Sequence, residues 1–514
     1  MMQTVAKLHD IPLDRGLEVE AGDEKILLVR DGEAVRALAA KCPHAGASLA
    51  EGAVCDGRIV CPWHKAMFRV SDGGLLEAPA LEGLARYEVR IDGDDVLVGA
   101  RMAAAVPAAA ADDRRVVVIG GGAAGAAAVA ALREFGLGGD IALVGREPRP
   151  PYDRTALSKF VMSGDMPADD APALLPEGFF SGQRVTRIEA EIVALDPAAK
   201  RIALGDGTSR GYDVAIIATG AAAKRPDLPG IGLEGVHTLR EAADAAAIVA
   251  GLDEGARAVI LGGSFIGLEV ASGLRERGLS VAVVTPEPVP FVKQMGEQLG
   301  AMFKALHERH GVVFHAGTQA RAIEGDGRVR RVVLEDGSAV PADLVIVGVG
   351  VAPQTGFARG LRREEDGGIV VDAGMRAGAD VFAVGDVARF PFGGAASVRI
   401  EHWRVAQQHA RVAARNIAGG DAAYDGVPFF WTYHFGKRFE YLGHPHEWDA
   451  VVVDGDLDQQ RFVALMVKQG EIVGVVACDR EQATARLIVR MRNPLSLEHA
   501  RELLAPSVSG SGLQ

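Results

Sequence analysis

Residues Arg114–Leu132, RRVVVIGGGAAGAAAVAAL, decide the fold of this chain. Val116–Ile119 are consecutive β-branched residues, as in a strand buried in a parallel sheet, and an alanine-rich stretch typical of a helix follows. Between the two stand the residues of a G-x-G-x-x-G motif, Gly120, Gly122, Ala123 and Gly125. In a strand–turn–helix context this spacing lets a pyrophosphate approach the backbone at the helix N-terminus. The stretch predicts a dinucleotide-binding α/β fold, with a plain glycine turn as the alternative in a chain that holds 64 glycines.

A second copy of the pattern lies in Ala258–Gly273, AVILGGSFIGLEVASG. Gly262 and Gly267 hold its outer positions, but Ser264 replaces the middle glycine, so the backbone is less free to approach a phosphate. Two such motifs imply either two bound dinucleotides or one motif kept as scaffold. We expect a second dinucleotide-binding unit here.

Acidic residues follow both motifs at the distance where a carboxylate meets an adenosine ribose hydroxyl. Glu147 comes after the first motif and Glu287 after the second. A solvated loop carboxylate is the alternative for Glu147. No arginine cluster accompanies Glu287 to receive a 2′-phosphate, which favours NADH over NADPH.

The composition limits what the chain can bind. With 55 Lys and Arg against 68 Asp and Glu the net charge is −13, and the absence of a basic block argues against nucleic acid as a partner. No apolar run is long enough for a membrane span, and the N-terminus has no apolar signal region. We therefore expect a cytoplasmic protein, and a length of 514 residues suggests roughly three or four domains.

Two of the four cysteines are grouped with histidines, and so few cysteines do not make a disulfide scaffold. Cys42 and His44 lie on one predicted loop, C-P-H, and Cys61 and His64 lie on another, C-P-W-H. One thiolate and one imidazole from each loop is the arrangement of a [2Fe–2S] centre, in which the cysteines hold one iron and the histidines the other. Zinc is the alternative, but a Cys2His2 finger pairs Cys with Cys and His with His on a helix.

The segment around these loops predicts a small antiparallel β domain over residues 1–102, because its short alternating runs are separated by Gly and Asp. These runs are Ile26–Val29, Val54–Val60, Ala85–Ile91 and Asp95–Val98. Residues 103–112, of low complexity, are typical of a connector, with a short Ala-rich helix as the alternative.

Further buried strands end in glycine-containing turns: Asp213–Gly220 with Thr219 and Gly220, Ala342–Gly350 with Gly350, and Val381–Asp386 with Gly385. Asp386 at such a strand end can accept hydrogen bonds from the ribityl hydroxyls of a flavin, although an N-cap role would use the same side chain. A helix is expected from residue 402 to Ile417. Residues 425–505 predict a small α+β domain whose aromatic start, Phe429–Tyr433, is either core or a flavin wall.

Four features give the chain a resemblance to a known family. They are PYDRTALSK at Pro151–Lys159, IIATG at Ile216–Gly220, VFAVGD at Val381–Asp386, and the second motif with Glu269. Residues 113–505 resemble FAD-dependent pyridine nucleotide reductases, namely the ferredoxin reductases of aromatic-ring dioxygenase systems and the apoptosis-inducing-factor group. Residues 1–102, with C-x-H and C-x-x-H intact, resemble a Rieske ferredoxin. The whole chain is similar to apoptosis-inducing-factor-like proteins that fuse the two.

The resemblance implies FAD, NADH and a [2Fe–2S] cluster, the cluster held by Cys42, His44, Cys61 and His64. It implies FAD beside Gly120, Gly122, Gly125, Glu147, Arg154, Lys159, Asp386, Trp403 and Trp431. It implies NADH beside Gly262, Ser264, Gly267 and Glu287. Further candidate cofactor-binding residues are Ala123, Thr219, Gly220, Gly350 and Gly385. Lys159 and Glu269 would be the catalytic pair near the flavin ring.

The expected architecture is multidomain, with an all-β Rieske domain followed by two α/β Rossmann-like domains and an α+β domain. The expected bounds are 1–102 for the Rieske domain, 103–112 for the linker, 113–228 with 353–424 for FAD, 229–352 for NAD and 425–514 for the C-terminal domain. The resemblance also allows a homodimer.

The expected function is electron transfer from NADH through FAD and the Rieske centre to a one-electron acceptor, which is a ferredoxin, an oxygenase or a cytochrome. The two histidine ligands would be the exposed side from which electrons leave. The alternative is a redox-responsive interaction protein with slow NADH turnover and a charge-transfer complex. The electron-input part of a nitrite reductase is disfavoured, because the chain has no set of sirohaem cysteines.

Overall fold

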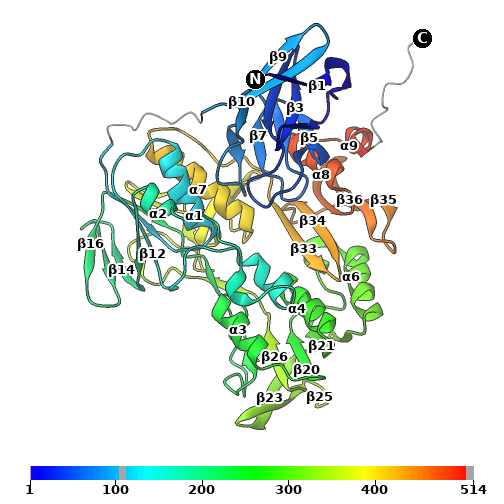
Figure 1. Cartoon of the computed structure of the whole chain (residues 1–514). Coiled ribbons are helices and arrows are strands. Elements are labelled where there is room, and N and C mark those ends of the chain that lie inside the picture. The colour runs from blue at the N-terminus through cyan, green and yellow to red at the C-terminus, as the bar shows by residue number, and fades with distance from the viewer. Residues whose placement is uncertain (1, 104–111, 505–514) are drawn as a thin grey trace.

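The computed structural model describes residues 2–103 and 112–504 (Figure 1). The expected connector, residues 103–112, lies outside the described residues except for its two ends. Within the described residues, no helix is both long and apolar enough to cross a membrane.

The N-terminal part is an antiparallel β domain, as predicted. One sheet has the strand order β1-β10-β9-β4-β3-β2 and the other the order β5-β6-β7-β8. Their bounds are β1 Gln3–Lys7, β2 Leu17–Ala21, β3 Glu24–Asp31, β4 Ala34–Ala39, β5 Ala53–Cys55, β6 Arg58–Val60, β7 Met67–Arg69, β8 Leu75–Glu77, β9 Arg86–Asp92 and β10 Asp95–Arg101. The run Val54–Val60 is a hairpin and not one strand, because Asp56 and Gly57 both have positive φ and turn the chain.

The first α/β unit forms around the opening motif. Its sheet has the order β13-β12-β11-β17-β30-β29 and is parallel except for the β29–β30 pair. The strands are β11 Val116–Ile119, β12 Ile141–Gly145, β13 Val185–Glu189, β17 Val214–Ile217, β29 Arg376–Gly378 and β30 Val381–Ala383. The alanine-rich α1 (Ala123–Glu134) packs on α7 (Trp403–Ile417), as the neighbouring cyan and yellow helices of Figure 1 show. Small side chains on α1 allow this close approach, so α7 is positioned beside the glycine turn.

The second α/β unit is built on the second motif. Its parallel sheet has the order β19-β26-β20-β21-β22. The elements are β19 Val236–His237, β20 Arg257–Leu261, β21 Ser280–Thr285, β22 Val313–Ala316, β26 Leu344–Val347, α3 Ala242–Ala250, α4 Phe265–Glu276, α5 Val292–Met295 and α6 Glu297–Arg309. A hairpin sheet of β23 Ala320–Asp326, β24 Arg328–Leu334 and β25 Ala339–Pro341 completes this unit.

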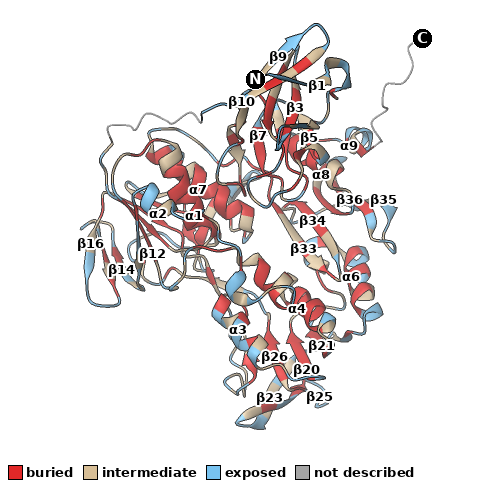
Figure 2. Ribbon diagram, in the orientation of Figure 1, coloured by how far each residue is buried: buried red, intermediate tan, exposed pale blue. Residues whose placement is uncertain are grey.

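The C-terminal part is an antiparallel sheet in the order β33-β34-β37-β36-β35, with two helices. The elements are β33 Phe429–His434, β34 Lys437–Gly443, β35 Ala450–Asp456, β36 Arg461–Lys468, β37 Glu471–Cys478, α8 Glu481–Arg490 and α9 Leu497–Leu504. In Figure 1 the blue N-terminal strands lie directly beside α8 and α9, and residues of β5 to β7 share one hydrophobic core with this C-terminal part. Figure 2 shows that the strands facing this junction are buried.

The smaller elements connect these parts. They are η1 Leu8–Asp10, η2 Leu49–Glu51, β14 Ile192–Asp196, β15 Arg201–Leu204, β16 Ser209–Gly211, β18 Ala221–Ala223, β27 Val351–Pro353, η3 Leu157–Val161, η4 Ala168–Asp170, α2 Phe179–Gly182, β28 Ile369–Val370, η5 Gly385–Val387, β31 Ala388–Phe392 and β32 Ala395–Val398. The antiparallel pair β18–β27 joins the two α/β units beside the carboxyl ends of their central strands. Parallel α/β sheets bind ligands at such ends, so this pair lies where a ligand site is expected.

Candidate functional site

A cavity of about 500 Å³ opens at the carboxyl ends of β11 and β17 and reaches the N-terminus of α4. Most of the residues predicted from the sequence line it. They are His44, His64, Gly120, Gly122, Ala123, Glu147, Arg154, Lys159, Thr219, Gly220, Ser264, Gly267, Glu269, Gly350, Gly385, Asp386, Trp403 and Trp431. The cavity therefore brings together side chains from the N-terminal β domain, both α/β units and the C-terminal part.

Five predicted residues are outside the cavity lining: Cys42, Cys61, Gly125, Gly262 and Glu287. Gly125 is a packing position, because a Cβ there would lie 1.9 Å from the carbonyl oxygen of Gly120. Gly262 has a similar role, since its Cβ would lie 2.5 Å from the carbonyl oxygen of Gly348 at a φ of +103°. Gly125 lets α1 approach the turn after β11, and Gly262 lets the turn after β20 approach the turn after β26.

The glycine turn after β11 fits the pyrophosphate of FAD. Gly120 has a φ of +119° and a Cβ there would lie 2.2 Å from the carbonyl oxygen of Ala218, so only glycine fits. At Gly121 and Gly122, in contrast, a Cβ would meet no atom within 4 Å, and both residues line the cavity. Open space beside this backbone at the start of α1 is what an approaching phosphate needs.

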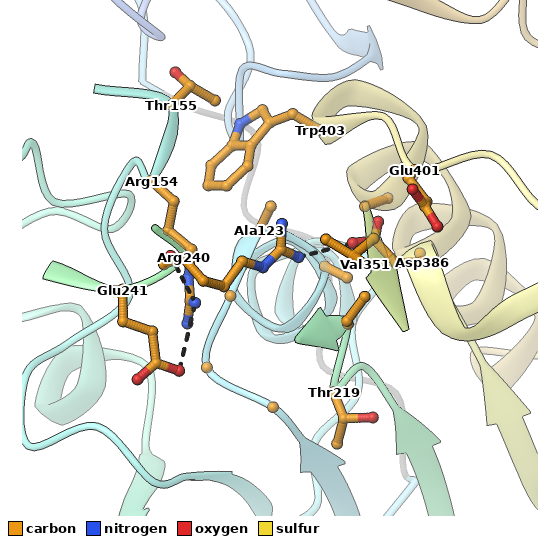
Figure 3. A pocket seen from close by; sticks show the side chains of 18 of the residues that line it. Ala123, Arg154, Thr155, Thr219, Arg240, Glu241, Val351, Asp386, Glu401 and Trp403 are labelled. Atoms are coloured by element: carbon orange, nitrogen blue, oxygen red, sulfur yellow. Dashed lines mark hydrogen bonds and ion pairs between the residues drawn. The ribbon is translucent and has the colours of Figure 1, made fainter. Parts of the chain in front are cut away.

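Charged side chains lie opposite this turn (Figure 3). Arg240 Nη2 donates to Asp386 Oδ2 at 2.8 Å, and Arg154 Nη1 lies 3.7 Å from Glu241 Oε1. Arg154 also forms an ion pair with Glu147. Paired cations and carboxylates at 12 to 27 % side-chain exposure can exchange partners with the hydroxyls and phosphates of a nucleotide.

Sequence reasoning did not find Arg240 or Glu241. They precede the Ala-rich helix α3 and lie on the cavity only because α3 packs beside the segment that holds Arg154. No motif or spacing in the sequence marks them.

The predicted catalytic pair is in contact. Lys159 Nζ lies 3.0 Å from Glu269 Oε1, and the two side chains are 6 and 3 % exposed. Lys159 lies in a turn of π-helix, Leu157–Val161, and Glu269 lies in the second turn of α4. The Lys159 ammonium also lies 4.6 Å from the centre of the Trp431 ring. A buried cation fixed in this way can stabilise negative charge that develops in the cavity.

Ser264 caps α4 at the position where the motif usually has glycine. Its hydroxyl accepts a hydrogen bond from the Gly267 N–H at 3.1 Å, so it takes up one of the free N–H groups at the helix start. Glu287 accepts hydrogen bonds from the Thr285 hydroxyl at 3.1 Å and from Lys293 at 2.9 Å. The Lys293 side chain is 76 % exposed, and the Glu287 side chain that pairs with it is 29 % exposed, so this carboxylate lies close to solvent.

The four predicted cluster ligands form two pairs, as a two-iron centre requires. The Nδ1 atoms of His44 and His64 converge to 3.1 Å, with the rings 4.7 Å apart. The Cys42 and Cys61 thiols are both buried and interact with each other, which lowers the pKa of Cys61 to about 7 and raises the pKa of Cys42. Burial keeps the pKa of His64 well below its ordinary value, so the imidazole is neutral and can act as a ligand. Among the described residues, no three His, Cys, Asp or Glu side chains converge as one mononuclear site would need.

The two histidines face inward, which contradicts the expectation that they form the exposed side from which electrons leave. Both line the cavity, and the His64 ring packs 5.1 Å from the ring of Trp431. The physical reason is the docking of the N-terminal domain, whose ligand loops are placed against β33 and the start of α7. The histidine side of the predicted cluster site therefore faces the cavity.

A group of buried polar contacts, which we call the docking network, holds the N-terminal domain in this position. Lys65 follows His64 directly, is 0 % exposed, and lies 2.9 Å from Glu440, which is 2 % exposed. Arg404, also 2 % exposed, donates to the carbonyl oxygens of Lys65 at 2.9 Å and Ala78 at 2.8 Å. Glu77 accepts from Arg404 at 2.5 Å and also pairs with Arg492. Charges buried in this way are stable only while both partners stay in place.

The aromatic segment that starts β33 is partly core and partly cavity lining. Phe429 is 1 % exposed and belongs to the core shared with the N-terminal domain, while Phe430 and Trp431 also line the cavity. Trp431 lies between the His64 ring and the Lys159 ammonium. One strand therefore contacts both His64, a predicted cluster ligand, and Lys159 of the predicted catalytic pair.

Family models match three parts of the chain. The model described as pyridine nucleotide-disulphide oxidoreductase matches residues 114–410, the Rieske [2Fe-2S] domain model matches residues 1–88, and the model described as reductase C-terminal matches residues 429–505. These matches agree with the multidomain architecture predicted from the sequence.

Relatives and solved structures are similar over most of the chain. Apoptosis-inducing factor 3 of Homo sapiens is 34 % identical over 507 residues, with 94 % of this chain and 82 % of that protein covered. Rhodocoxin reductase of Rhodococcus erythropolis is 35 % identical over 378 residues, with 72 % of this chain and 88 % of that protein covered. The ferredoxin reductase for the CYP199A2 system from Rhodopseudomonas palustris superposes with a TM-score of 0.72 at 30 % identity, covering 76 % of this chain and all of that one. The covalent putidaredoxin reductase–putidaredoxin complex gives a TM-score of 0.71 at 27 % identity, covering 77 % of this chain and 97 % of that one.

Proposed function

Because this chain belongs to the pyridine nucleotide-disulphide oxidoreductase family and carries a Rieske [2Fe-2S] domain, we propose that it passes electrons from NADH through FAD to its own cluster and on to a one-electron acceptor. The observation that carries the proposal is the lining of the cavity. His44 and His64 line the same space as Lys159, Glu269 and the glycine turn. Donor and carrier sites are therefore joined within one polypeptide.

FAD, when bound, would supply the chemistry that no side chain has: acceptance of a hydride from NADH and release of its two electrons one at a time, with the proton released separately. The residues of the chain would bind and orient FAD and NADH and stabilise the charge that forms between them. The turn at Gly120–Gly122 and the Arg240–Asp386 pair would hold the cofactor. Lys159, fixed by Glu269, would stabilise the negative charge that a hydride brings into the cavity.

The acceptor is a one-electron carrier of the ferredoxin type or a metalloprotein that such carriers serve, namely an oxygenase or a cytochrome. Relatives named as ferredoxin–NAD(+) reductase components of dioxygenase systems support this class, among them one of Paraburkholderia xenovorans that is 34 % identical over 378 residues. NADH is favoured over NADPH, because Glu287 follows the second motif at the spacing of a carboxylate that binds a ribose hydroxyl, and a carboxylate there would repel a 2′-phosphate.

Anaerobic mixing with NADH tests the proposal. Flavin absorbance should bleach first, and the EPR signal of a reduced Rieske cluster should follow without any added carrier. Steady reduction of an added one-electron acceptor should then continue under excess NADH. A long-lived NADH complex that reduces no acceptor and changes sedimentation would instead identify a redox-responsive interaction protein.

A further inference from the structure

A buried chain of polar side chains leads away from the cavity into the second α/β unit. Glu269 Oε1, beside Lys159, accepts a hydrogen bond from Thr432 Oγ1 at 2.7 Å. Thr432 Oγ1 lies 2.9 Å from His434 Nε2, and His434 Nδ1 lies 3.2 Å from His307 Nε2. The chain is continuous from Glu269 on α4 through β33 to the last turn of α6.

These groups are sealed from solvent over their whole length. Thr432 is 1 % exposed, and His434 and His307 are 0 % exposed. Burying two polar rings among phenylalanines is unfavourable unless the rings are hydrogen-bonded. Here each ring has a partner except at the far end, where His307 Nδ1 is buried without one. A core that needed only packing would use apolar side chains at both positions.

The order of donors and acceptors suits proton movement. Burial, and to a smaller extent the charge of Lys159, lowers the pKa of His434 to about 3, and burial keeps the pKa of His307 well below its ordinary value. Both rings are therefore neutral, with one nitrogen that donates and one that accepts. While Glu269 is ionised, the Thr432 hydroxyl donates to it, so His434 Nε2 donates to Thr432 and His307 Nε2 donates to His434 Nδ1. When Glu269 has taken up a proton, the same contacts run in the opposite direction: Glu269 donates to Thr432, Thr432 donates to His434 Nε2, and His434 Nδ1 donates to His307. A proton taken up at Glu269 then leaves the chain at His307.

The proposed function, on which this inference rests, requires such a path. Each NADH yields NAD⁺, two electrons and one proton, and the two electrons leave singly through the cluster. One proton must therefore leave the cavity by a separate path. Lys159 and Glu269 are buried, and Trp431 and the docked N-terminal domain cover their cluster side.

We propose that Thr432, His434 and His307 form a proton relay that connects the Lys159–Glu269 pair with the outer end of α6. His307 lies one helical turn before His310, an exposed residue whose ring stacks on Phe435 at 3.9 Å. The Phe435 ring is also 5.0 Å from the His307 ring, so the far end of the relay lies beneath this surface. The relay separates the path of the proton from the path of the electrons.

A purely structural role is the competing explanation, because the same contacts orient Glu269. The substitution His434→Gln separates the two explanations. A glutamine amide can donate to Thr432 and accept from His307, but it does not exchange protons as an imidazole does. His310→Gln is the matched control, because it changes an exposed histidine of the same region outside the relay.

The experiment mixes the anaerobic holoprotein with NADH in weak buffer containing a pH indicator, and follows flavin absorbance, indicator absorbance and cluster EPR. In His434→Gln we expect the ratio of the proton-release rate to the flavin-reduction rate to fall about 100-fold, the scale of one positioned proton-transfer group. Cluster reduction should slow with it. His310→Gln should keep the wild-type ratio. A wild-type ratio in His434→Gln would overturn the relay.

Two further measurements keep the inference testable if that variant does not fold. Thr432→Val, which keeps the shape and removes the hydroxyl, should give the same fall in the ratio. Side-chain ¹⁵N NMR of the oxidised protein, before any NADH is added, should show His434 with one protonated nitrogen. A doubly protonated His434 would be unable to accept a proton and would contradict the relay. If the wild type itself reduces no flavin with NADH, the proposed function fails first and the relay fails with it.

Discussion

Removal of the Lys65 ammonium should detach the iron–sulfur domain from the flavin cavity. In Lys65→Met the carboxylate of Glu440, 2 % exposed, would stay buried without the partner that lies 2.9 Å away. Breaking a buried ion pair in this way costs about 3–5 kcal/mol. Glu440 keeps the Thr484 hydroxyl and has Arg438 at 3.7 Å, so the lower end of that range applies. About 3 kcal/mol corresponds to a roughly 100-fold weaker docking equilibrium.

The assay compares two rates in the same anaerobic sample. Flavin reduction by NADH should stay close to that of the wild type, because Lys65 is not among the residues that line the cavity. Cluster reduction, followed by freeze-quench EPR, should become several-fold slower at least, because it needs the docked domain. Cluster content must match the wild type in iron and sulfide analysis, since Lys65 follows a cluster ligand directly.

Two companion variants make the test specific. Lys437→Met removes a lysine whose pair with Asp479 is exposed, with side chains 35 and 43 % accessible, and should change docking by roughly 0–1 kcal/mol. The double variant Lys65→Met with Glu440→Leu removes both buried charges and should recover most of the wild-type rate. If Lys65→Met passes electrons to a fully loaded cluster as fast as Lys437→Met does, the docking network does not position the cluster.

Three further changes test other parts of the account. Lys159→Ala should slow flavin reduction by NADH about 100-fold in stopped-flow traces while FAD stays bound, because orientation and charge at the cavity are lost. Glu287→Arg should lower the ratio of kcat/KM for NADH over NADPH at least roughly 10-fold, because a guanidinium attracts a 2′-phosphate. Burial lowers the pKa of His409 to about 3. Below pH ~6.5 the unfolded chain therefore binds a proton at this histidine that the folded chain does not bind, and the free energy of unfolding decreases as the pH is lowered. His409→Leu should therefore reduce the loss in unfolding free energy between pH 6.5 and pH 5 by about 2 kcal/mol in urea titrations.

Local sequence patterns predicted the parts of the molecule that depend on local constraints. The glycine at 125 is required by a contact with the Gly120 backbone within one strand–turn–helix unit, and the glycine at 120 by its positive φ in the turn, so their spacing is visible in the sequence. The two C-x-H-type loops are equally local, because each supplies two ligands within a few residues. The strand ends that carry Thr219 and Asp386 could be located for the same reason.

Features that depend on contacts between distant segments could not be predicted. Lys65 and Glu440 are 375 positions apart, and neither belongs to a motif. In the sequence alone, Lys65 is a lysine in a predicted loop, and a side chain of that kind is expected to be solvated. The inward direction of His44 and His64 has the same origin, since it depends on which surface the N-terminal domain docks against.

The relay residues show the same limit. Thr432 and His434 alternate on β33, which places both side chains on the face toward α4, but a short aromatic strand gives no sign of a polar chain beneath it. Their partners Glu269 and His307 come from two other elements. Only the packing of α4, α6 and β33 against one another reveals the connection.

The most direct test of the central claim is the rate at which the cluster becomes reduced after NADH addition, measured over a wide range of protein concentration. If the docked domain receives electrons from the flavin site of its own chain, the rate constant stays the same at every concentration. A rate that rises in proportion to protein concentration, or a cluster that stays oxidised under excess NADH, would contradict the account.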